Sequence, residues 1–312
     1  MQNKKEKKFI SIVLYLHNVK EEIIPFFQEI ISLLEEKFER FEIIGVNDDC
    51  TDGSIEILKE YLEKKKIAAM VNIVHMSFFH GLESSMNAGR DLAIGDFVYE
   101  FDSIDGDYPK EMIWKAFEKV MEGNDIVGVR PEGGGSLSSG VFYALYNKTS
   151  RGKGKIGTES FRILSRRAIN RVKSMGQYIP YRKAVYANCG LKTSYISYTP
   201  VKKTKKNRSR MERTSLALDS FIYFTNALER ISVMISVLFL CLSIGMGVYI
   251  LKDYLSGSSV VEGWLSTMGF LSVGFFGVFT LLTIILKYLS VLLNLIFRHQ
   301  RYLIMEIEKV VK

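Results

Sequence analysis

The sequence has few of the residues that build disulfide-rich or metal-clustering folds. Among its 312 residues are three cysteines, four histidines and five prolines. Cys50, Cys189 and Cys241 are odd in number and far apart, so neither a disulfide framework nor a cysteine metal site is expected. The histidines show no pair at metal-ligand spacing. We expect the cysteines to be reduced and structural, as in a cytoplasmic domain.

Signal-peptide and repeat features are also lacking. The segment before Phe9 is too polar to be the apolar core of a cleavable signal peptide, so none is expected there. No internal repeat is visible. With 47% hydrophobic residues, the chain is long enough for one sizeable domain and a further part.

Charged residues are missing from two long windows in the last third of the chain. No charge lies between Arg230 and Lys252, or between Gly263 and Lys287. Each window has about the 20 residues that a helix needs to cross a bilayer. The windows predict two transmembrane helices, and a buried hairpin in a soluble protein is the alternative.

Positive charge is unevenly distributed along the chain, whose net charge is +8. Residues 201–213 contain many lysines and arginines against the single acid Glu212, whereas the link at 252–263 has one lysine and two acids. Because basic loops stay cytoplasmic, we predict that this link is outside and both termini are inside. The basic run adjoins a membrane and lacks interleaved aromatics, so we expect anionic lipid as its partner and no nucleic acid.

Strand and helix patterns alternate through the first two thirds of the chain. Apolar runs predict strands at 9–16, 41–46, 71–75, 97–101 and 125–129, with helices at 21–38, 55–64, 81–93 and 109–121 between them. This alternation predicts an α/β fold with a mostly parallel, Rossmann-like sheet. Further along we expect a strand near 161–164, helices near 165–173 and 179–187, a last strand at 192–201, and an amphipathic helix at 214–229 on the membrane surface.

Acidic residues follow the predicted strand 97–101. Asp102, Asp105 and Asp107 come directly after it, and ligands of open α/β sheets bind at the carboxyl ends of strands. Crowded carboxylates need a cation or several donors, so the pattern indicates a hard metal that bridges to a substrate phosphate. A solvated loop that caps the helix near Pro109 is the alternative.

Several motifs occur in an order typical of one enzyme family. They are residues 9–19, the NDDCTDGS turn at 47–54, residues 81–96, the strand that ends in Asp102, Arg130, and FRILSRR at 161–167. Together they resemble the inverting family 2 glycosyltransferases, which have a GT-A fold. The order of soluble domain, surface helix and two spans is similar to the polyprenyl-phosphate glycosyltransferases, the group of dolichyl-phosphate mannose synthase and the bacterial undecaprenyl-phosphate enzymes.

The resemblance covers nearly the whole chain and implies a domain organisation. A GT-A glycosyltransferase domain is expected at 1–212 and an amphipathic juxtamembrane helix at 213–230. A two-helix transmembrane hairpin is expected at 231–297, followed by a cytoplasmic tail at 298–312. The family also implies a homo-oligomer, a tetramer, in the cell membrane with its catalytic domain in the cytoplasm.

The resemblance further implies a donor site. Asp48 matches the aspartate that reads the nucleotide base, while Asn18, Asn87 and Gly89 are expected to line the nucleotide site. Asp102 matches the first acid of the DxD motif, whose Mg²⁺ or Mn²⁺ binds the donor pyrophosphate. Asp105 is the second metal-ligand candidate.

Four features depart from the family pattern. Ile104 stands where the second acid of the DxD motif is usual, and it would share a face with Asp102 if the strand continued. Asn47 replaces an acid beside Asp48. In the segment that matches GDFR, Ser160 replaces the acid and Glu159 precedes it, so the acid is displaced by one position or lost. The second arginine of the acceptor loop is replaced by glycines at 133–135.

A phosphate acceptor tolerates these losses better than a sugar hydroxyl does. A phosphomonoester has its second pKa at about 6, so it is already nucleophilic at neutral pH and needs positioning more than a base. Guanidinium forks suit that positioning. Arg130 and Arg162 are the candidates, Arg162 also as a catalytic residue with Asp102, and Lys202, Lys203 and Arg208 form a second set facing the membrane.

Three functions remain open from the sequence. The first is transfer of a sugar from a UDP-hexose or UDP-N-acetylhexosamine to polyprenyl phosphate at the cytoplasmic face of the membrane, for modification of cell-envelope glycans. The second is a family 2 transferase with another lipid or glycan acceptor, although no QxxRW-type motif of a processive synthase is present. The third is a catalytically weakened nucleotide-sugar binder, which Asn47, Ile104 and Ser160 suggest.

Overall fold

The structure is a computed structural model that separates into two compact units. One unit comprises Met1–Lys148, Gly152–Ala217 and Arg298–Lys312, and the other comprises Thr149–Arg151 and Leu218–Phe297. The residues that the structure describes are 5–65, 67, 69–133, 140, 143–144, 146–148, 154–174, 181–201, the single positions 234, 235, 237, 241, 245, 248, 252 and 255, and then 264–297 and 302–311.

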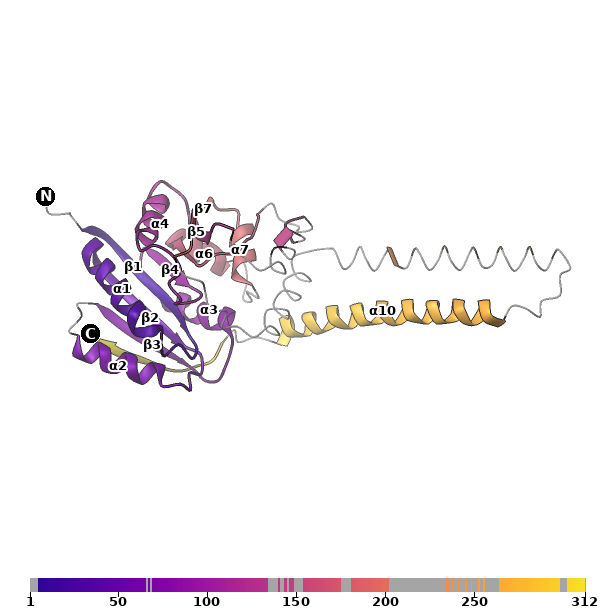
Figure 1. Cartoon of the computed structure of the whole chain (residues 1–312), viewed down its shortest axis with the longest axis horizontal. Coiled ribbons are helices and arrows are strands. Elements are labelled where there is room, and N and C mark those ends of the chain that lie inside the picture. The colour runs from indigo at the N-terminus through magenta and orange to yellow at the C-terminus, as the bar shows by residue number, and fades with distance from the viewer. Residues whose placement is uncertain are drawn as a thin grey trace. The chain divides into compact units, whose positions relative to one another are not determined.

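The larger unit is built on an eight-stranded sheet with the order β7-β5-β6-β4-β1-β2-β3-β8 (Figure 1). Strands β1 to β4 run parallel, as do β5 and β7, whereas β6 and β8 are antiparallel to their neighbours. The predicted α/β fold with a mostly parallel sheet is confirmed. The strands are β1 (Glu6–Leu16), β2 (Phe38–Asn47), β3 (Met70–Met76), β4 (Phe97–Phe101), β5 (Ile126–Pro131), β6 (Phe161–Ser165), β7 (Thr193–Tyr198) and β8 (Ile304–Val311).

Helices alternate with the strands, as the sequence patterns predict. They are α1 (Ile23–Lys37), α2 (Ser54–Lys64), α3 (Leu82–Leu92), α4 (Glu111–Met121), α6 (Arg166–Ser174) and α7 (Arg182–Asn188). One continuous hydrophobic core joins α1, α2 and α4 to alternate residues of the strands, such as Ile12 and Tyr99. Helices α3 and α7 contact the opposite face. Because both faces are covered, apolar side chains occur on both faces of the inner strands, with a few buried polar exceptions such as Glu42 and Glu100.

The carboxyl ends of the parallel strands meet at one edge of the sheet. Leu16 of β1 pairs with Asn47 of β2, which pairs with His75 of β3. Strand β4 ends nearby, since Phe101 pairs with Leu14. The loops that follow these strands therefore come together, which is the edge where ligands of this fold class bind.

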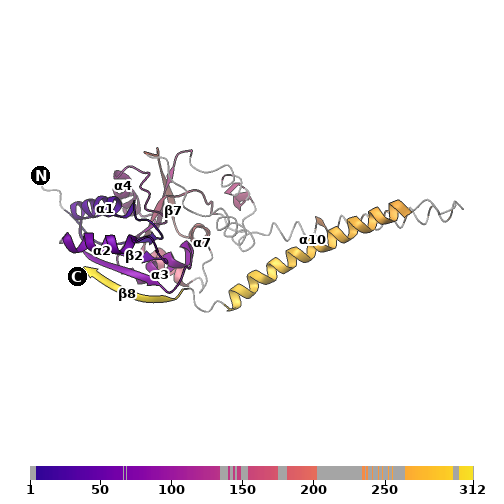
Figure 2. The ribbon, with the colours of Figure 1, turned by 60° about the horizontal axis from the view of Figure 1, so that its bottom comes forward.

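The C-terminal strand β8 is the last strand of the sheet, next to β3. Residues 298–312 are expected from the sequence to form a cytoplasmic tail, but β8 pairs with β3 along almost its whole length (Figure 2). The yellow strand lies beside β3 and near α2 in both views (Figures 1 and 2). Strand β8 thereby covers the backbone groups of β3 that would otherwise be exposed at a sheet edge.

The smaller unit contains α10 (Trp264–Phe297), a continuous helix of 34 residues. Lys287 is its one charged residue. When only the described residues are counted, no helix is both long and apolar enough to span a membrane. The predicted surface helix at 214–229 lies outside the described residues, so the membrane arrangement stays a prediction.

The structure corrects the expectation that Ile104 could share a face with Asp102. Strand β4 ends at Phe101, and Ile104 is 3% exposed within the core on the side of α1 and α4. Asp102 lies in the polar cluster described below. The chain has turned between the two residues, because the strand stops before the alternation of its side chains can continue.

A glycine in α3 allows this helix to approach the sheet. A Cβ atom at Gly89 would lie 2.5 Å from Cγ1 of Val13 and 2.6 Å from Cγ2 of Val46. We expect Gly89→Ala to lower the free energy of unfolding by about 1–3 kcal/mol through overpacking, measured by chemical denaturation.

A control and a rescue make this prediction specific. Gly157→Ala is the control, since a Cβ atom there would have no other atom within 4 Å, and it should leave stability unchanged. Adding Val46→Ala to Gly89→Ala should recover part of the loss. A double variant no more stable than Gly89→Ala would show that the contact with Val46 is not the cause.

Candidate active site

A buried carboxylate, Glu100 of β4, lies at the centre of a polar cluster. Its Oε2 accepts hydrogen bonds from Nη1 of Arg162 at 2.8 Å and from Nη1 of Arg182 at 2.7 Å. Its Oε1 accepts one from the Tyr186 hydroxyl at 2.6 Å. Glu100 and both arginines are at most 1% exposed. Charges buried this deeply require ionic and hydrogen-bond partners, so these contacts hold β4, β6 and α7 in one arrangement.

Asp102, the predicted metal ligand, accepts hydrogen bonds from the same two arginines. Its Oδ1 accepts from Nη2 of Arg182 at 2.7 Å, and its Oδ2 accepts from Nη2 of Arg162 at 2.9 Å. The side chain is 10% exposed. A ligand that reaches Asp102 must therefore share its oxygens with a guanidinium or displace one.

Arg162, the predicted acceptor-phosphate residue, is bound by three carboxylates. Besides Glu100 and Asp102, Glu159 accepts a hydrogen bond from its Nε at 2.9 Å, so the acid displaced from the family motif still reaches this arginine. Burial alone would lower the pKa of Arg162, but Asp102, Glu159 and Glu100 raise it well above its usual value. The guanidinium is 1% exposed, so contact with an acceptor phosphate requires rearrangement and stays a prediction.

Arg182 of α7 connects the cluster to α3. Its Nε and its backbone N–H both donate to Oε2 of Glu83, at 2.9 Å and 3.0 Å. Glu83 is in the first turn of α3, where a negative charge also interacts favourably with the helix dipole. The cluster therefore connects α3, α7, β4 and β6.

Sequence reasoning missed Glu100, Arg182, Tyr186 and Glu83. A signal for Glu100 exists, because a carboxylate inside the apolar run 97–101 must find partners once the strand is buried. The sequence does not say which partners. Arg182 carries no such signal, since its neighbours 181–188 form an ordinary helical segment.

Asp48, the residue predicted to read the nucleotide base, lies directly after β2. It is fully buried, its Oδ1 accepts from the His80 backbone N–H at 2.7 Å, and its Oδ2 accepts from the Gly81 N–H and the Tyr15 hydroxyl, both at 2.9 Å. Asp48 thus connects the loop after β2 to the start of α3. Direct reading of a base by this carboxylate would require one of these bonds to open.

The other residues predicted to line the nucleotide site differ in exposure. Asn18 is exposed, has a positive φ of 50°, and accepts a hydrogen bond from the Thr51 N–H at 2.9 Å. It therefore connects the loops after β1 and β2 at the ligand edge. Asn87 is 3% exposed in α3, and Gly89 faces the strands beneath that helix.

The remaining predicted residues are more dispersed. Arg130 is exposed at the end of β5, and its guanidinium carbon lies 4.4 Å from the centre of the Tyr195 ring. Asp105 is half-buried beyond β4. Lys202, Lys203 and Arg208 lie outside the described residues. In the part of the chain that the structure describes, no group of three or more His, Cys, Asp or Glu residues could hold a metal ion.

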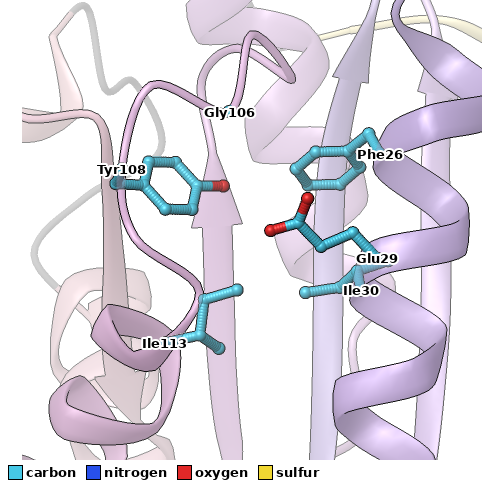
Figure 3. A pocket seen from close by; sticks show the side chains of 6 residues that line it. All are labelled: Phe26, Glu29, Ile30, Gly106, Tyr108 and Ile113. Atoms are coloured by element: carbon cyan, nitrogen blue, oxygen red, sulfur yellow. The ribbon is translucent and has the colours of Figure 1, made fainter. Parts of the chain in front are cut away.

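A narrow hollow beside α1 is separate from these residues. Figure 3 shows the Tyr108 hydroxyl pointing across it towards Glu29. This hydroxyl has no hydrogen-bond partner among the described residues, and burial followed by the charge of Glu29 raises the pKa of Tyr108 well above its usual value. None of the predicted site residues belongs to its lining, which consists of Phe26, Glu29, Ile30, Gly106, Tyr108 and Ile113.

The cluster predicts a strong effect of removing the charge of Glu100. We expect Glu100→Gln to lower the free energy of unfolding by about 3–5 kcal/mol, because two buried guanidiniums then lack part of their neutralising charge. Chemical denaturation followed by tryptophan fluorescence measures this. Glu60→Gln is the matched control, since Glu60 pairs with Lys64 on the exposed surface and should have no measurable effect. Equal stability of the two variants would contradict the central role of Glu100.

Comparisons with known proteins agree with this architecture. The model of the family described as glycosyl transferase family 2 matches residues 11–174, just over half of the chain. A prophage bactoprenol glucosyl transferase homolog of Escherichia coli is 27% identical over 272 residues, covering 83% of this chain and 86% of the relative. The uncharacterized glycosyltransferase YkcC of Bacillus subtilis is 28% identical over 194 residues, and the chain spans only 59% of its length.

A solved structure has the same fold. The mannosyltransferase PcManGT from Pyrobaculum calidifontis, in complex with GDP-Man and Mn²⁺, matches with a TM-score of 0.53. At 13% sequence identity the match covers 96% of this chain and 90% of that one, and at this identity it supports the fold alone. With the family model matched over residues 11–174, the chain belongs to glycosyl transferase family 2.

Proposed function

We propose that the chain transfers a sugar from a nucleotide-sugar donor, a UDP-hexose or UDP-N-acetylhexosamine, to polyprenyl phosphate. The observation that carries this proposal is the extent of similarity to the bactoprenol glucosyl transferase homolog. That alignment covers 272 residues, more than the span 11–174 of the family domain, so it includes sequence outside the domain. Similarity confined to the domain would support only a family 2 transferase.

The chemistry of the cluster supports an acceptor that brings its own charge. A sugar hydroxyl needs a general base, but Glu83, Glu100 and Asp102 each accept hydrogen bonds from Arg182. A proton on any of these carboxylates would weaken its ion pair, so they are poor bases in this arrangement. A phosphomonoester is already ionised at neutral pH and requires only positioning.

The guanidinium of Arg130 is more accessible to an acceptor phosphate than that of Arg162. It is exposed at the carboxyl end of β5, and stacking on Tyr195 limits the motion of its planar fork. We propose that Arg130, with Lys202 and Arg208 of the basic run, binds the lipid phosphate. Arg162 contributes after exchange of one of its carboxylates, or by holding Asp102 in position.

The charge of the cluster fits a divalent metal ion. Among the described residues, the four carboxylates of Glu83, Glu100, Asp102 and Glu159 pair with the guanidiniums of Arg162 and Arg182, and Arg90 adds a third positive charge near Glu100, so the carboxylates outnumber the arginines of the cluster. We propose that Asp102, with Asp105, holds Mg²⁺ or Mn²⁺ when the donor pyrophosphate supplies further oxygen ligands. When bound, the ion neutralises charge on the departing nucleoside diphosphate.

Sheet topology supports an even number of membrane crossings. Strands β7 and β8 belong to one sheet, so the chain between Tyr198 and Ile304 must leave and return on the same side of any membrane that it crosses. Two spans at 231–297 satisfy this condition. With the basic run at 201–213 on the cytoplasmic side, the transferase domain is cytoplasmic and the link at 252–263 is outside. The tetramer rests on the family resemblance alone.

The reaction can be tested with purified full-length protein in detergent. We expect radiolabelled sugar from a UDP-glucose, UDP-galactose or UDP-N-acetylglucosamine panel to enter the lipid extract with undecaprenyl phosphate and Mg²⁺. Undecaprenol, which lacks the phosphate, is the matched control and should accept none. Equal labelling of undecaprenol would exclude the phosphate acceptor, and full transfer in a chelator would exclude the metal.

Cysteine labelling tests the membrane arrangement. A Ser258→Cys variant should react with an impermeant thiol reagent in whole cells, because the link at 252–263 is outside. Lys205→Cys should react only after lysis, since the basic run faces the cytoplasm. The reverse pattern would invert the topology, and labelling of both sites in whole cells would contradict a single crossing between residues 205 and 258.

A further inference from the structure

Strand β8 makes side-chain contacts beyond its pairing with β3. Oε2 of Glu308 accepts hydrogen bonds from Nζ of Lys59 at 2.6 Å and from Nε2 of His75 at 3.1 Å. The hydrogen bond from Lys59, and then that from His75, hold the pKa of the Glu308 carboxyl below its usual value. Glu308 is therefore charged at neutral pH and is anchored to α2 and β3.

His75 connects this carboxylate to the loop after β2. Its Nδ1 lies 3.0 Å from Nδ2 of Asn47, and Oδ1 of Asn47 accepts a hydrogen bond from the Cys50 backbone N–H at 3.0 Å. Because a backbone N–H can only donate, the Asn47 oxygen faces Cys50 and its amide group donates to His75. The proton of neutral His75 is then on Nε2, which donates to Glu308. The chain of hydrogen bonds runs from β8 to Cys50.

A second histidine makes a parallel connection. The Leu303 backbone N–H donates to Nε2 of His80 at 3.1 Å, and the Leu303 carbonyl accepts from the Ser77 N–H at 3.0 Å. Nδ1 of His80 donates to the Phe78 carbonyl at 2.5 Å, which leaves Nε2 as the acceptor. The His80 backbone N–H donates to Asp48 at 2.7 Å. Leu303, at the start of the C-terminal segment, is therefore connected to Asp48 through a single residue, His80.

We propose that β8 positions the nucleotide end of the active site through His75 and His80. This rests on the proposed function and on the family resemblance, which predicts that Asp48 in the loop 47–53 reads the nucleotide base of the donor. Asn47 and Asp48 are adjacent at the end of β2. Asn47 is connected through His75 to Glu308 of β8, and Asp48 is connected through His80 to Leu303, directly before β8. Glu308, His75 and His80 are positioning residues, since they act on the donor through the loop and do not contact it.

The proposal makes the final residues of the chain part of the transferase site. Strand β8 is 106 residues after the end of β7 at Tyr198, beyond both charge-free windows. The donor end of the site is then complete only after the intervening chain has returned to the sheet. Tight donor binding therefore depends on a segment that lies outside the family domain at 11–174.

Hydrogen exchange and kinetics on the full-length protein test this role. In Glu308→Ala we expect the amides of 47–53 to exchange at least about tenfold faster than in the wild type, without any donor present. We expect the KM for the UDP-sugar donor to rise about tenfold, equivalent to about 1.4 kcal/mol, with kcat within about twofold. Glu308→Gln keeps an oxygen that accepts from His75 and should restore both values.

Two controls separate positioning from general stability. Glu306→Ala removes an exposed carboxylate from the same strand and should change neither exchange nor KM. Lys59→Met removes the other partner of Glu308 and should lower the melting temperature without altering exchange at 47–53. If Glu308→Ala is folded but leaves loop exchange and donor KM unchanged, the proposal is overturned. Faster exchange in a protein whose wild type uses no nucleotide sugar would support the positioning and reject the proposed reaction.

Discussion

The buried carboxylate of Glu100 is the constraint on which the site depends. Desolvating a charge inside a sheet is costly, and Glu100 recovers that cost only by binding Arg162, Arg182 and Tyr186 together. These partners come from β6 and α7. Asp102 follows two residues later and accepts from the same two guanidiniums, so the acid at the ligand edge is oriented by the partners of Glu100. A loop carboxylate without them would sample many positions.

The departures from the family pattern have structural explanations. The side-chain amide of Asn47 donates a hydrogen bond to Nδ1 of neutral His75. An ionised aspartate at this position could not donate one. Ile104 fills the core after the chain turns away from Asp102. Ser160 lies 2.5 Å from the Tyr198 hydroxyl, while the displaced acid Glu159 binds Arg162. None of the three substitutions therefore indicates by itself a weakened enzyme.

The C-terminal strand changes how the chain is divided into parts. A boundary at 212 separates the transferase domain from the rest of the sequence, but β8 returns the chain to the sheet beside β3. The strand protects a sheet edge and also reaches the loop that holds Asn47 and Asp48. The last residues of the chain and the loop after β2 are consequently parts of one hydrogen-bonded unit.

The sequence by itself determined the features that arise from local periodicity and motif order. Alternating strand and helix patterns were sufficient for the α/β class and the mostly parallel sheet, and the ordered motifs were sufficient for the family. Asp102 was found because a strand end is visible as a change from apolar to acidic residues. Glu100 could have been suspected from a charge inside the run 97–101, without its partners.

Only the tertiary structure decided which residues bind one another. Arg162 is 62 residues from Glu100, and Arg182 is 80 residues from Asp102. His75 and Glu308 are 233 residues apart, and although the β-branched residues of β8 are typical of a strand, nothing in its sequence indicates that it pairs with β3. No local pattern encodes such contacts, because their partners are selected by the folding of distant segments onto one sheet.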